Sequence, residues 1–274
     1  MMLHKILRGI APVAALAASA MLAGCDTHIS IGDNNGVPLA ELDLSGEAPT
    51  ALAVVGPDNV VVTTGNKLDI DVSGDQAAVD ALRFSLEDGA LGISRERDSG
   101  KDLGKATVRV TMPSLTALTV AGSGSVEVAE LTGTAEVTIA GSGSAKIAKV
   151  AASTLDLTIA GSGDVEAAGT VEKLDMTIAG SGSGRMAGLA VQTADISVVG
   201  SGSTEFSSDG KVDANIMGSG SVTVNGAASC TVSAMGSGKL NCRAGETRKA
   251  DGAPPAPKAP KAPKAPAAPE APEA

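Results

Sequence analysis

The pentapeptide Ala121-Gly122-Ser123-Gly124-Ser125 opens a Gly-Ser-Gly repeat that occurs seven times in the chain. The later copies are 18 to 20 residues apart and begin at Gly141, Gly161, Gly180, Gly200, Gly218 and Gly236. A period near 19 that holds through seven copies is typical of a solenoid, in which each copy forms one coil stacked on the previous one. The repeat predicts an architecture, and it specifies no molecular activity.

Apolar and polar residues alternate before each Gly-Ser-Gly. The second position before the first glycine holds Val120, Ile139, Ile159, Ile178, Val198, Ile216 and Ala234, and the fourth holds Leu118, Val137, Leu157, Met176, Ile196, Ala214 and Val232. The position between them holds Thr119, Thr138, Thr158, Thr177, Ser197, Asn215 and Ser233. Alternation of this kind indicates a β-strand with one buried face.

A second short strand follows each Gly-Ser-Gly, as in Val126-Glu127-Val128. Two short strands and two corners fit about 19 residues, with glycine supplying the positive φ values that a sharp corner needs. Each strand then pairs in parallel with its copy in the next coil, about 4.8 Å away. We therefore predict an all-β fold, a parallel β-helix or β-solenoid with coils of about 19 residues.

The N-terminus has the features of a targeting segment at residues 1–24. Lys5 and Arg8 precede an apolar stretch, and Leu22-Ala23-Gly24-Cys25 follows it. This pattern suits a cleaved signal peptide better than a transmembrane helix. Leu-Ala-Gly-Cys resembles the lipobox of bacterial lipoproteins, which implies lipidation of Cys25 and a membrane contact through that lipid. Ordinary signal cleavage beside an incidental cysteine is the alternative.

Asp26 follows the lipidation site directly. In enteric bacteria an aspartate at this position resembles the sorting signal that retains a lipoprotein in the inner membrane, although the rule differs between lineages. Loss of the targeting segment removes Lys5 and Arg8 and no acid, so the net charge changes from −10 to −12. Such an acidic chain is unsuited to nucleic acid or an anionic lipid surface, and charge favours cations or basic surfaces as partners.

The remaining chain divides into three predicted regions. Residues 25–41 are a linker near the anchor, and the solenoid spans 42–249, with irregular first coils to about 115 and regular repeats over 116–243. A separate small domain is the alternative for the irregular part, where Asp75 to Leu82 can form one helical turn. The tail at 250–274 is rich in Pro, Ala and Lys and is predicted to be a disordered or extended spacer.

The irregular part carries a family resemblance. The run from Val54 to Gly65, the hairpin at Leu86-Glu87-Asp88-Gly89-Ala90-Leu91 and the run from Val108 into Gly122 resemble the bacterial family called putative auto-transporter adhesin, head GIN domain. The resemblance covers roughly Leu42 to Arg243. It implies a secreted or lipid-anchored β-helical solenoid with no established biochemical activity, and the word adhesin rests on analogy.

Few residues suited to catalysis are present. Of the two histidines, His4 belongs to the targeting segment and His28 lies beside the anchor, so no Ser-His, Cys-His or multi-His site can be assembled. Trp and Tyr are absent, and the two aromatic residues are Phe84 and Phe206. Phe206 takes an inward position and is expected in the core. A sugar-binding face built on aromatic stacking is therefore excluded.

One acidic position recurs in five successive coils. If the coils stack in register, the position forms a column of carboxylates about 4.8 Å apart, next to the Thr/Ser column: Glu136, Asp156, Asp175, Asp195 and Asp213. Ca²⁺ is the candidate cofactor, because carboxylate and hydroxyl oxygens suit hard cations. The alternative is a solvated face without a ligand. Carboxylate pairs also hydrolyse glycans, but that reaction needs a cleft between coils, which near-uniform spacing disfavours.

Two cysteines remain after Cys25. Cys230 precedes Gly236 by six residues and Cys242 follows it by six, both with inward parity. In an oxidising compartment they are a candidate disulfide at the end of the solenoid. Because opposite walls of a coil are normally too far apart for a disulfide, the pairing requires the last coil to taper.

These features predict a lipid-anchored protein of the bacterial cell envelope that is not an enzyme. We expect a non-catalytic adhesion or scaffold module whose partner is an envelope polymer or a surface ligand. A periplasmic polymer-sensing or envelope-stress binding protein is the alternative, and a glycan-active enzyme on the acidic column is the less favoured one.

Overall fold

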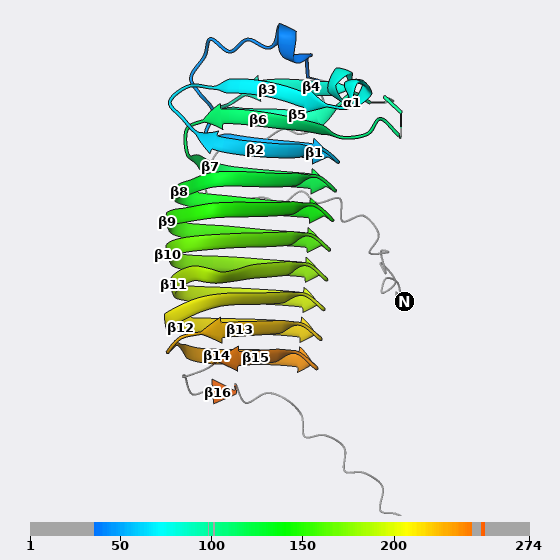
Figure 1. Cartoon of the computed structure of the whole chain (residues 1–274). Coiled ribbons are helices and arrows are strands. Elements are labelled where there is room, and N and C mark those ends of the chain that lie inside the picture. The colour runs from blue at the N-terminus through cyan, green and yellow to red at the C-terminus, as the bar shows by residue number, and fades with distance from the viewer. Residues whose placement is uncertain (1–35, 98, 101, 243–247, 250–274) are drawn as a thin grey trace, which may run out of the picture.

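The computed structural model describes residues 36–97, 99–100, 102–242 and 248–249 (Figure 1). The predictions for the targeting segment, Cys25, Asp26 and the tail at 250–274 concern residues outside this set. No helix in the described ranges is long and apolar enough to span a bilayer.

Five long strands form the regular part of the molecule. They are β8 (Ser125–Gly141), β9 (Ser144–Gly161), β10 (Asp164–Gly180), β11 (Ser183–Gly200) and β12 (Ser203–Gly218). Each pairs in parallel with the next, so equivalent residues stack, as Leu155, Leu174 and Ala194 do. The stack makes about seven turns of roughly 19 residues, which confirms the predicted β-solenoid (Figure 1).

The Gly-Ser-Gly corners need glycine for a steric reason. Gly161 has a φ of +123°, and a Cβ there would lie 3.1 Å from the carbonyl carbon of Gly141 in the coil above. The corners are also hydrogen-bonded, since the Ser162 N–H donates to the Gly141 carbonyl oxygen at 2.8 Å. The second glycine is crowded as well, because a Cβ on Gly163 would meet the Gly143 carbonyl oxygen at 2.7 Å. The Gly-Ser-Gly sequence therefore recurs because the backbones of successive corners stack too closely to admit a Cβ.

The second corner differs from the expectation of two separate short strands. In the structure each strand from β8 to β12 continues through this corner for 16 to 18 residues. The bend is taken up by shifts in the pairing register, next to Gly133 in β8 and Gly169 in β10. Both glycines have positive φ values, +75° and +131°. The ladder therefore bends without breaking, because a bulge increases local curvature while pairing continues on both sides.

The first coils are not stacked in sequence order. Their strands are β1 (Ala51–Gly56), β2 (Asn59–Thr64), β3 (Asp69–Gly74), β4 (Leu82–Glu87), β5 (Ala90–Arg95), β6 (Ala106–Met112) and β7 (Leu115–Gly122). β1 pairs with both β5 and β7, and β2 pairs with both β6 and β8. The β1–β2 coil therefore lies between two coils that follow it in sequence (Figure 1), and the irregular part is continuous with the solenoid sheet.

Two antiparallel strands close the N-terminal end. β3 pairs with β6, and β4 pairs with β5 through the predicted hairpin, in which Leu86 faces Leu91. The predicted helical turn is confirmed as α1 (Gln76–Asp80), and a 3-10 turn, η1 (Leu39–Glu41), lies on the same end (Figure 1). The end of the stack is thus covered by short edge strands and a helix, which limits further edge pairing.

We call the end formed by β3 to β6 with α1 the cap. A buried ion pair joins the cap to the β1–β2 corner. Asp58, which is 3% exposed, accepts hydrogen bonds from Arg95 Nε at 2.7 Å and Nη2 at 2.6 Å. The same carboxylate accepts the Ala106 backbone N–H at 2.8 Å. Asp58 lies in the corner Gly56-Pro57-Asp58, which occupies the place that Gly-Ser-Gly takes in later coils. One side chain therefore ties the end of β5 and the start of β6 to the coil beneath them.

The C-terminal end consists of β13 (Ser221–Asn225), β14 (Ser229–Gly236), β15 (Lys239–Cys242) and the two-residue β16 (Arg248–Lys249). A disulfide joins Cys230 of β14 to Cys242 of β15, with the two Cα atoms 6.5 Å apart. The cysteines stack on Val212 and Val224, which are fully buried. The disulfide therefore links the two walls of the last coil, in line with the ladders of the core.

Removing this disulfide should destabilise the solenoid moderately. We expect Cys230→Ala with Cys242→Ala to lower the free energy of unfolding by about 3 kcal/mol, because a short cross-linked loop no longer restricts the unfolded chain. Chemical denaturation without reductant measures the difference. Reductant should lower the stability of the original protein by a similar amount and leave the double variant unchanged, and an equal response of both would contradict the disulfide.

The core is made of stacked aliphatic side chains with one aromatic residue near each end. Phe206 is fully buried, which confirms its expected inward position, and it stacks between Met186 and Val224. Phe84 is buried in the cap. None of the described buried side-chain nitrogen or oxygen atoms lacks a hydrogen-bond partner. The buried polar side chains of the described residues are therefore all paired within the fold.

Candidate functional site

The five acidic residues lie in one register column on the outside of the strands. Glu136 pairs in register with Asp156, and the column continues to Asp175, Asp195 and Asp213. The Thr/Ser column runs beside it, as in the register of Thr138, Thr158 and Thr177. We call these two columns the acidic face. The backbones that carry neighbouring acidic residues are therefore about one strand spacing, roughly 4.8 Å, apart.

Lysines neutralise the C-terminal half of the acidic face. Lys173 Nζ lies 2.7 Å from Asp175 Oδ2 and 4.0 Å from Asp195 Oδ2. Lys211 Nζ lies 2.5 Å from Asp213 Oδ2. The hydrogen bonds with Asp175 and Asp213 raise the pKa values of the two lysines. Three of the five carboxylates thus have a cation beside them, supplied by the chain itself.

The N-terminal half of the acidic face carries uncompensated charge. Burial raises the pKa of Glu136 above its ordinary value of 4.5, and the neighbouring Asp156 raises it further. Burial also raises the pKa of Asp156, as does the charge of Asp175, while Lys173 lowers it. Ionising this pair opposes folding, since the folded protein holds the protons more tightly than the unfolded chain does.

A Glu136→Gln variant should be more stable at neutral pH. Because the folded-state pKa is raised, stability falls as the pH rises through it, and the variant removes that loss. We expect a gain of a few tenths of a kcal/mol, up to about 1, since solvent screens part of the repulsion. The gain should vanish well below pH 4.5, where the carboxyl is protonated in both states. Urea unfolding at pH 3.5 and pH 7.5 measures it, and a pH-independent gain would contradict the assignment.

Calcium binding to the acidic face stays a prediction. Within the described residues no three His, Cys, Asp or Glu side chains converge as metal ligands do. A bridging Ca²⁺ would therefore be held by the pair Glu136 and Asp156 with hydroxyl or water oxygens. Calorimetric titration with Ca²⁺, with Glu136→Gln as the control, tests this binding.

The wall that follows the Gly-Ser-Gly corner balances its charges by a different arrangement. Its outward column alternates in sign through Glu127, Lys146, Glu166, Arg185 and Glu205. Arg185 Nε lies 3.0 Å from Glu166 Oε1, and Arg185 Nη1 lies 3.4 Å from Asp164 Oδ1. Opposite charges that face each other across strands stabilise the sheet. Charged side chains of this wall therefore pair with one another, whereas the carboxylates in the N-terminal half of the acidic face have no such partners among the described residues.

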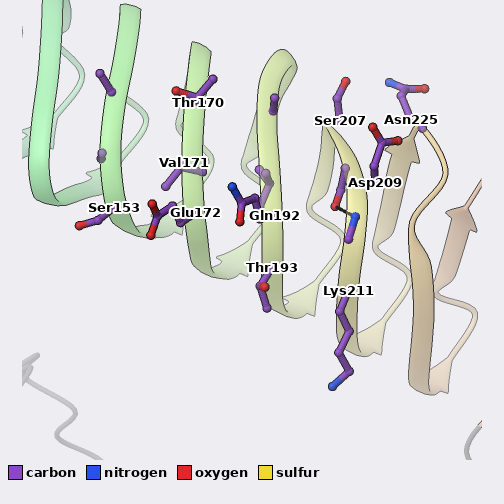
Figure 2. Close-up of a pocket in the computed structure, with 17 residues that line it drawn as sticks. Ser153, Thr170, Val171, Glu172, Gln192, Thr193, Ser207, Asp209, Lys211 and Asn225 are labelled. Carbon is purple, nitrogen blue, oxygen red and sulfur yellow. Dashed lines mark hydrogen bonds between the residues drawn. The ribbon is translucent and has the colours of Figure 1, made fainter.

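An open groove of about 1020 Å³ runs over the second corners from β9 to β13 (Figure 2). Beneath it lies a column of buried residues, Ala152, Val171, Val191 and Ser208, and the three apolar side chains among them belong to the core. One wall is the preceding column, Ala151, Thr170, Ala190, Ser207 and Asn225. The other wall contains Ser153, Glu172, Gln192 and Asp209. We call this feature the corner groove.

A change in coil length shapes the C-terminal part of the corner groove. The register of β11 with β12 moves from Met186–Phe206 directly to Ala190–Ser207, so three residues of β11 have no counterpart in β12. The β12 coil therefore turns earlier. The turn is tight, because any Cβ on Gly210 would collide with the carbonyl group of Gln192. It is held by hydrogen bonds from the Ala227 N–H to Asp209 Oδ1 at 2.8 Å and from Ser207 Oγ to the Ala187 carbonyl oxygen at 2.7 Å.

Four polar side chains of the corner groove have no hydrogen-bond partner among the described residues. They are Thr170, Glu172, Gln192 and Thr193, and all are exposed (Figure 2). The sequence did not reveal this groove, because the second corner has no shared residue type. The change in spacing from 20 to 18 residues after Gly200 is the signal that could have located it.

A family model matches residues 48–228 and is described as putative auto-transporter adhesin, head GIN domain. The chain belongs to this family. The resemblance inferred from the sequence is thereby confirmed, and the match includes the cap, the regular coils and the corner groove. The head GIN domain model ends before the coil that carries Cys230 and Cys242.

Solved structures share the head GIN domain fold of this chain. A putative adhesin from Bacteroides fragilis has 21% identity and a TM-score of 0.66, with 71% of this chain and 92% of that chain covered. A putative lipid binding protein from Parabacteroides distasonis has 23% identity, a TM-score of 0.56 and coverage of 72% and 93%. A putative adhesin from Parabacteroides merdae has 17% identity, a TM-score of 0.53 and coverage of 71% and 92%. No curated protein matches the chain significantly.

Proposed function

We propose that this head GIN domain protein is a lipid-anchored protein of the bacterial envelope that acts as a non-catalytic adhesion or scaffold module. In this proposal Cys25 carries the lipid and holds the chain at a membrane, and Asp26 directs its sorting. The solenoid then presents its outer faces to an envelope polymer or a surface ligand. Membership of a family described as adhesin-like supports this role.

The observation that carries the proposal is the continuous parallel ladder from β7 to β12. Its coils follow one another at 18 to 20 residues without an inserted loop. The result is a rigid rod with regular columns of side chains, an arrangement that suits contact over a long surface. The acidic face lies on an open wall of this rod, whereas glycosidases hold their two carboxylates on either side of a bound sugar. The open position therefore favours a non-catalytic role.

Protease accessibility of a C-terminally tagged protein tests the proposed location. Membrane fractionation tests the lipid anchor. We expect Cys25→Ala to release the protein from the membrane fraction, and the original protein to remain bound until detergent is added. Digestion in intact cells would support adhesion at the outer surface. Protection until the outer membrane is opened would favour the alternative of a periplasmic polymer-binding protein. A soluble original protein would overturn the lipid anchor.

The corner groove is the observation that favours this alternative. It crosses successive coils, and its free polar side chains do not pair within the described protein. A polymer-sensing protein needs such a surface, while a passive scaffold does not. The two roles share the anchor and the fold, and they differ in the compartment that the protease experiment identifies.

A further inference from the structure

We propose that the solenoid wall in front of the Gly-Ser-Gly corners is the docking surface for a segment of the chain's own tail, residues 256–264. This wall carries the acidic face and, beside it, an exposed apolar column. The contact lies within one chain, so it is independent of the proposed location in the cell and of the lipid anchor.

The apolar column occupies the position directly before each Gly-Ser-Gly. This position is two residues beyond the Thr/Ser position, so its side chains point outward on the same wall as the acidic face. Val199, Met217 and Met235 are 45%, 52% and 70% exposed, and they are three of the four large exposed hydrophobic side chains among the described residues. Large apolar side chains that gather on one surface indicate a contact site. We call the whole register column the apolar column: Ala121, Ala140, Ala160, Ala179, Val199, Met217 and Met235.

The chain leaves the described part of the structure beside the apolar column. β16 lies at the end of the stack and pairs in parallel with β14, with Lys249 opposite Val232 (Figure 1). Met235 is three residues further along β14, so the backbone at Lys249 is directed toward the apolar column. The tail at 250–274, which lies outside the described residues, therefore starts next to the most exposed side chain of this column.

The tail is long enough to reach the whole acidic face. The 15 residues from Ala250 to Lys264 span up to about 46 Å in the extended polyproline conformation that their sequence predicts. Glu136, at the far end of the acidic face, lies six strand spacings, or about 29 Å, from β16. The difference leaves several residues for the turn from the end of β16 onto the wall.

Residues 256–264 have the same period as the wall. They contain the triplet Ala-Pro-Lys three times and place Lys258, Lys261 and Lys264 at intervals of three. We call them the Ala-Pro-Lys segment. A polyproline helix has three residues per turn and rises about 3.1 Å per residue, so the lysines occupy one face about 9.3 Å apart. Two strand spacings are about 9.6 Å. A segment that lies along the axis therefore presents one lysine to every second coil, while its Ala and Pro side chains can cover the apolar column.

Charge complementarity also favours this occupant. The charged residues of the Ala-Pro-Lys segment are all lysines. Asp156 forms no ion pair among the described residues, and Asp195 has only Lys173 Nζ, 4.0 Å away. Asp156 and Asp195 lie two coils apart, which is the interval between successive lysines. Lys261 can therefore pair with Asp195 while Lys264 pairs with Asp156.

Attachment to the same chain makes these weak contacts sufficient. Each exposed ion pair contributes little by itself. A short linker, however, holds the segment at an effective concentration in the millimolar range. A second copy of the chain would have to reach that concentration in solution, so the tail is the favoured occupant of the wall.

Methionine oxidation tests the docking. The full chain is studied with Cys25→Ala and without detergent, because detergent would compete for the apolar column. Hydrogen peroxide oxidises exposed methionines, and mass spectrometry follows Met217. We expect Met217 to react about threefold faster when Lys258→Gln, Lys261→Gln and Lys264→Gln are combined, because the segment is then released from the wall. Thermal melting should be the same with and without these substitutions, so that faster oxidation is not a loss of fold.

A control variant and salt separate docking from a general effect of the tail. Glu270→Gln with Glu273→Gln changes charges of the same tail outside the Ala-Pro-Lys segment, and Met217 should then react as in the original chain. About 1 M NaCl should accelerate the oxidation of Met217 in the original chain and leave the lysine variant unchanged, because salt screens exposed ion pairs. Equal oxidation rates in the original chain, the lysine variant and the control would overturn the proposal.

Carbodiimide coupling identifies the occupant, because it joins a lysine to a carboxylate that it contacts. The pair Lys173 and Asp175, 2.7 Å apart, is the internal control for the reaction. Coupling that occurs only between two chains and increases with protein concentration would assign the wall to a second copy and overturn the proposal. We expect two cross-links within one chain, with yields independent of concentration: Lys261 to Asp195 and Lys264 to Asp156.

Discussion

Gly161→Ala is expected to lower the free energy of unfolding by about 3 kcal/mol or more. A φ of +123° is a conformation that side chains rarely adopt, which alone costs about 1–3 kcal/mol. The new Cβ would also lie within 3.1 Å of the Gly141 carbonyl carbon and 3.2 Å of its Cα. Those atoms belong to an equivalent corner and cannot move without disturbing the coil above it. Chemical denaturation monitored by far-UV circular dichroism measures the loss.

Gly133→Ala is the matched control in the same ladder. Gly133 also has a positive φ, +75°, but a Cβ there would meet only Thr116 Cγ2, at 4.0 Å. We expect a loss of about 1 kcal/mol, from backbone strain without a clash. Equal losses at the two positions would show that strain rather than close stacking sets the need for glycine at the Gly-Ser-Gly corner.

Asp58→Ala is expected to destabilise the protein by about 3–5 kcal/mol, because it leaves the guanidinium of Arg95 without its carboxylate partner in a largely buried site. The guanidinium side chain is 14% exposed, and the backbone N–H of Ala106 also loses its acceptor. The damage should concentrate in the cap, since β5 and β6 meet the corner through this carboxylate. Thermal unfolding measures the global loss, and hydrogen exchange should show faster exchange in β5 and β6 than in β10.

Glu96→Ala provides the comparison within the same cap. Glu96 pairs with Arg83 at 2.6 Å, but its side chain is 49% exposed. Exposed pairs contribute little, so we expect a loss below about 1 kcal/mol. A loss at Glu96 as large as that at Asp58 would contradict the assignment of Asp58 as the buried link between cap and solenoid.

The regular coils could be predicted because one physical constraint repeats in each of them. The stacked backbones at Gly161 and its equivalents leave no room for a Cβ. The alternation of apolar and polar residues before each of these glycines assigns side chains to the core or to the surface. The cap lacks such a constraint. The position of β1 and β2 between later coils depends on pairing between residues such as Ala51 and Ala117, far apart in sequence. The role of Asp58 was hidden for the same reason, since its partners Arg95 and Ala106 come from other coils.

The same contrast applies to the surfaces. The acidic column could be read from the sequence because Asp156 and Asp175 occupy equal positions before a glycine, and the ladder places them in register. The lysines beside the column belong to a less regular position, where Thr154 stacks on Lys173. The corner groove depends on where the β12 coil shortens, and its wall residues Glu172 and Gln192 share no type. Shape that arises from unequal coils leaves no repeat in the sequence.

The location of the β1–β2 coil sets the order in which the chain can fold. These strands are synthesised first, but Ala51 must wait for Ala117, 66 positions later, before it can pair with β7. Closing a loop of 66 residues costs about 1 kcal/mol more in entropy than closing a loop of about 20 residues, the separation of neighbouring regular coils. Neighbouring coils of the regular ladder close shorter loops and can nucleate earlier. The N-terminal strands β1 and β2 therefore emerge from the ribosome before any of the strands that they pair with, β5, β6, β7 and β8, has been made.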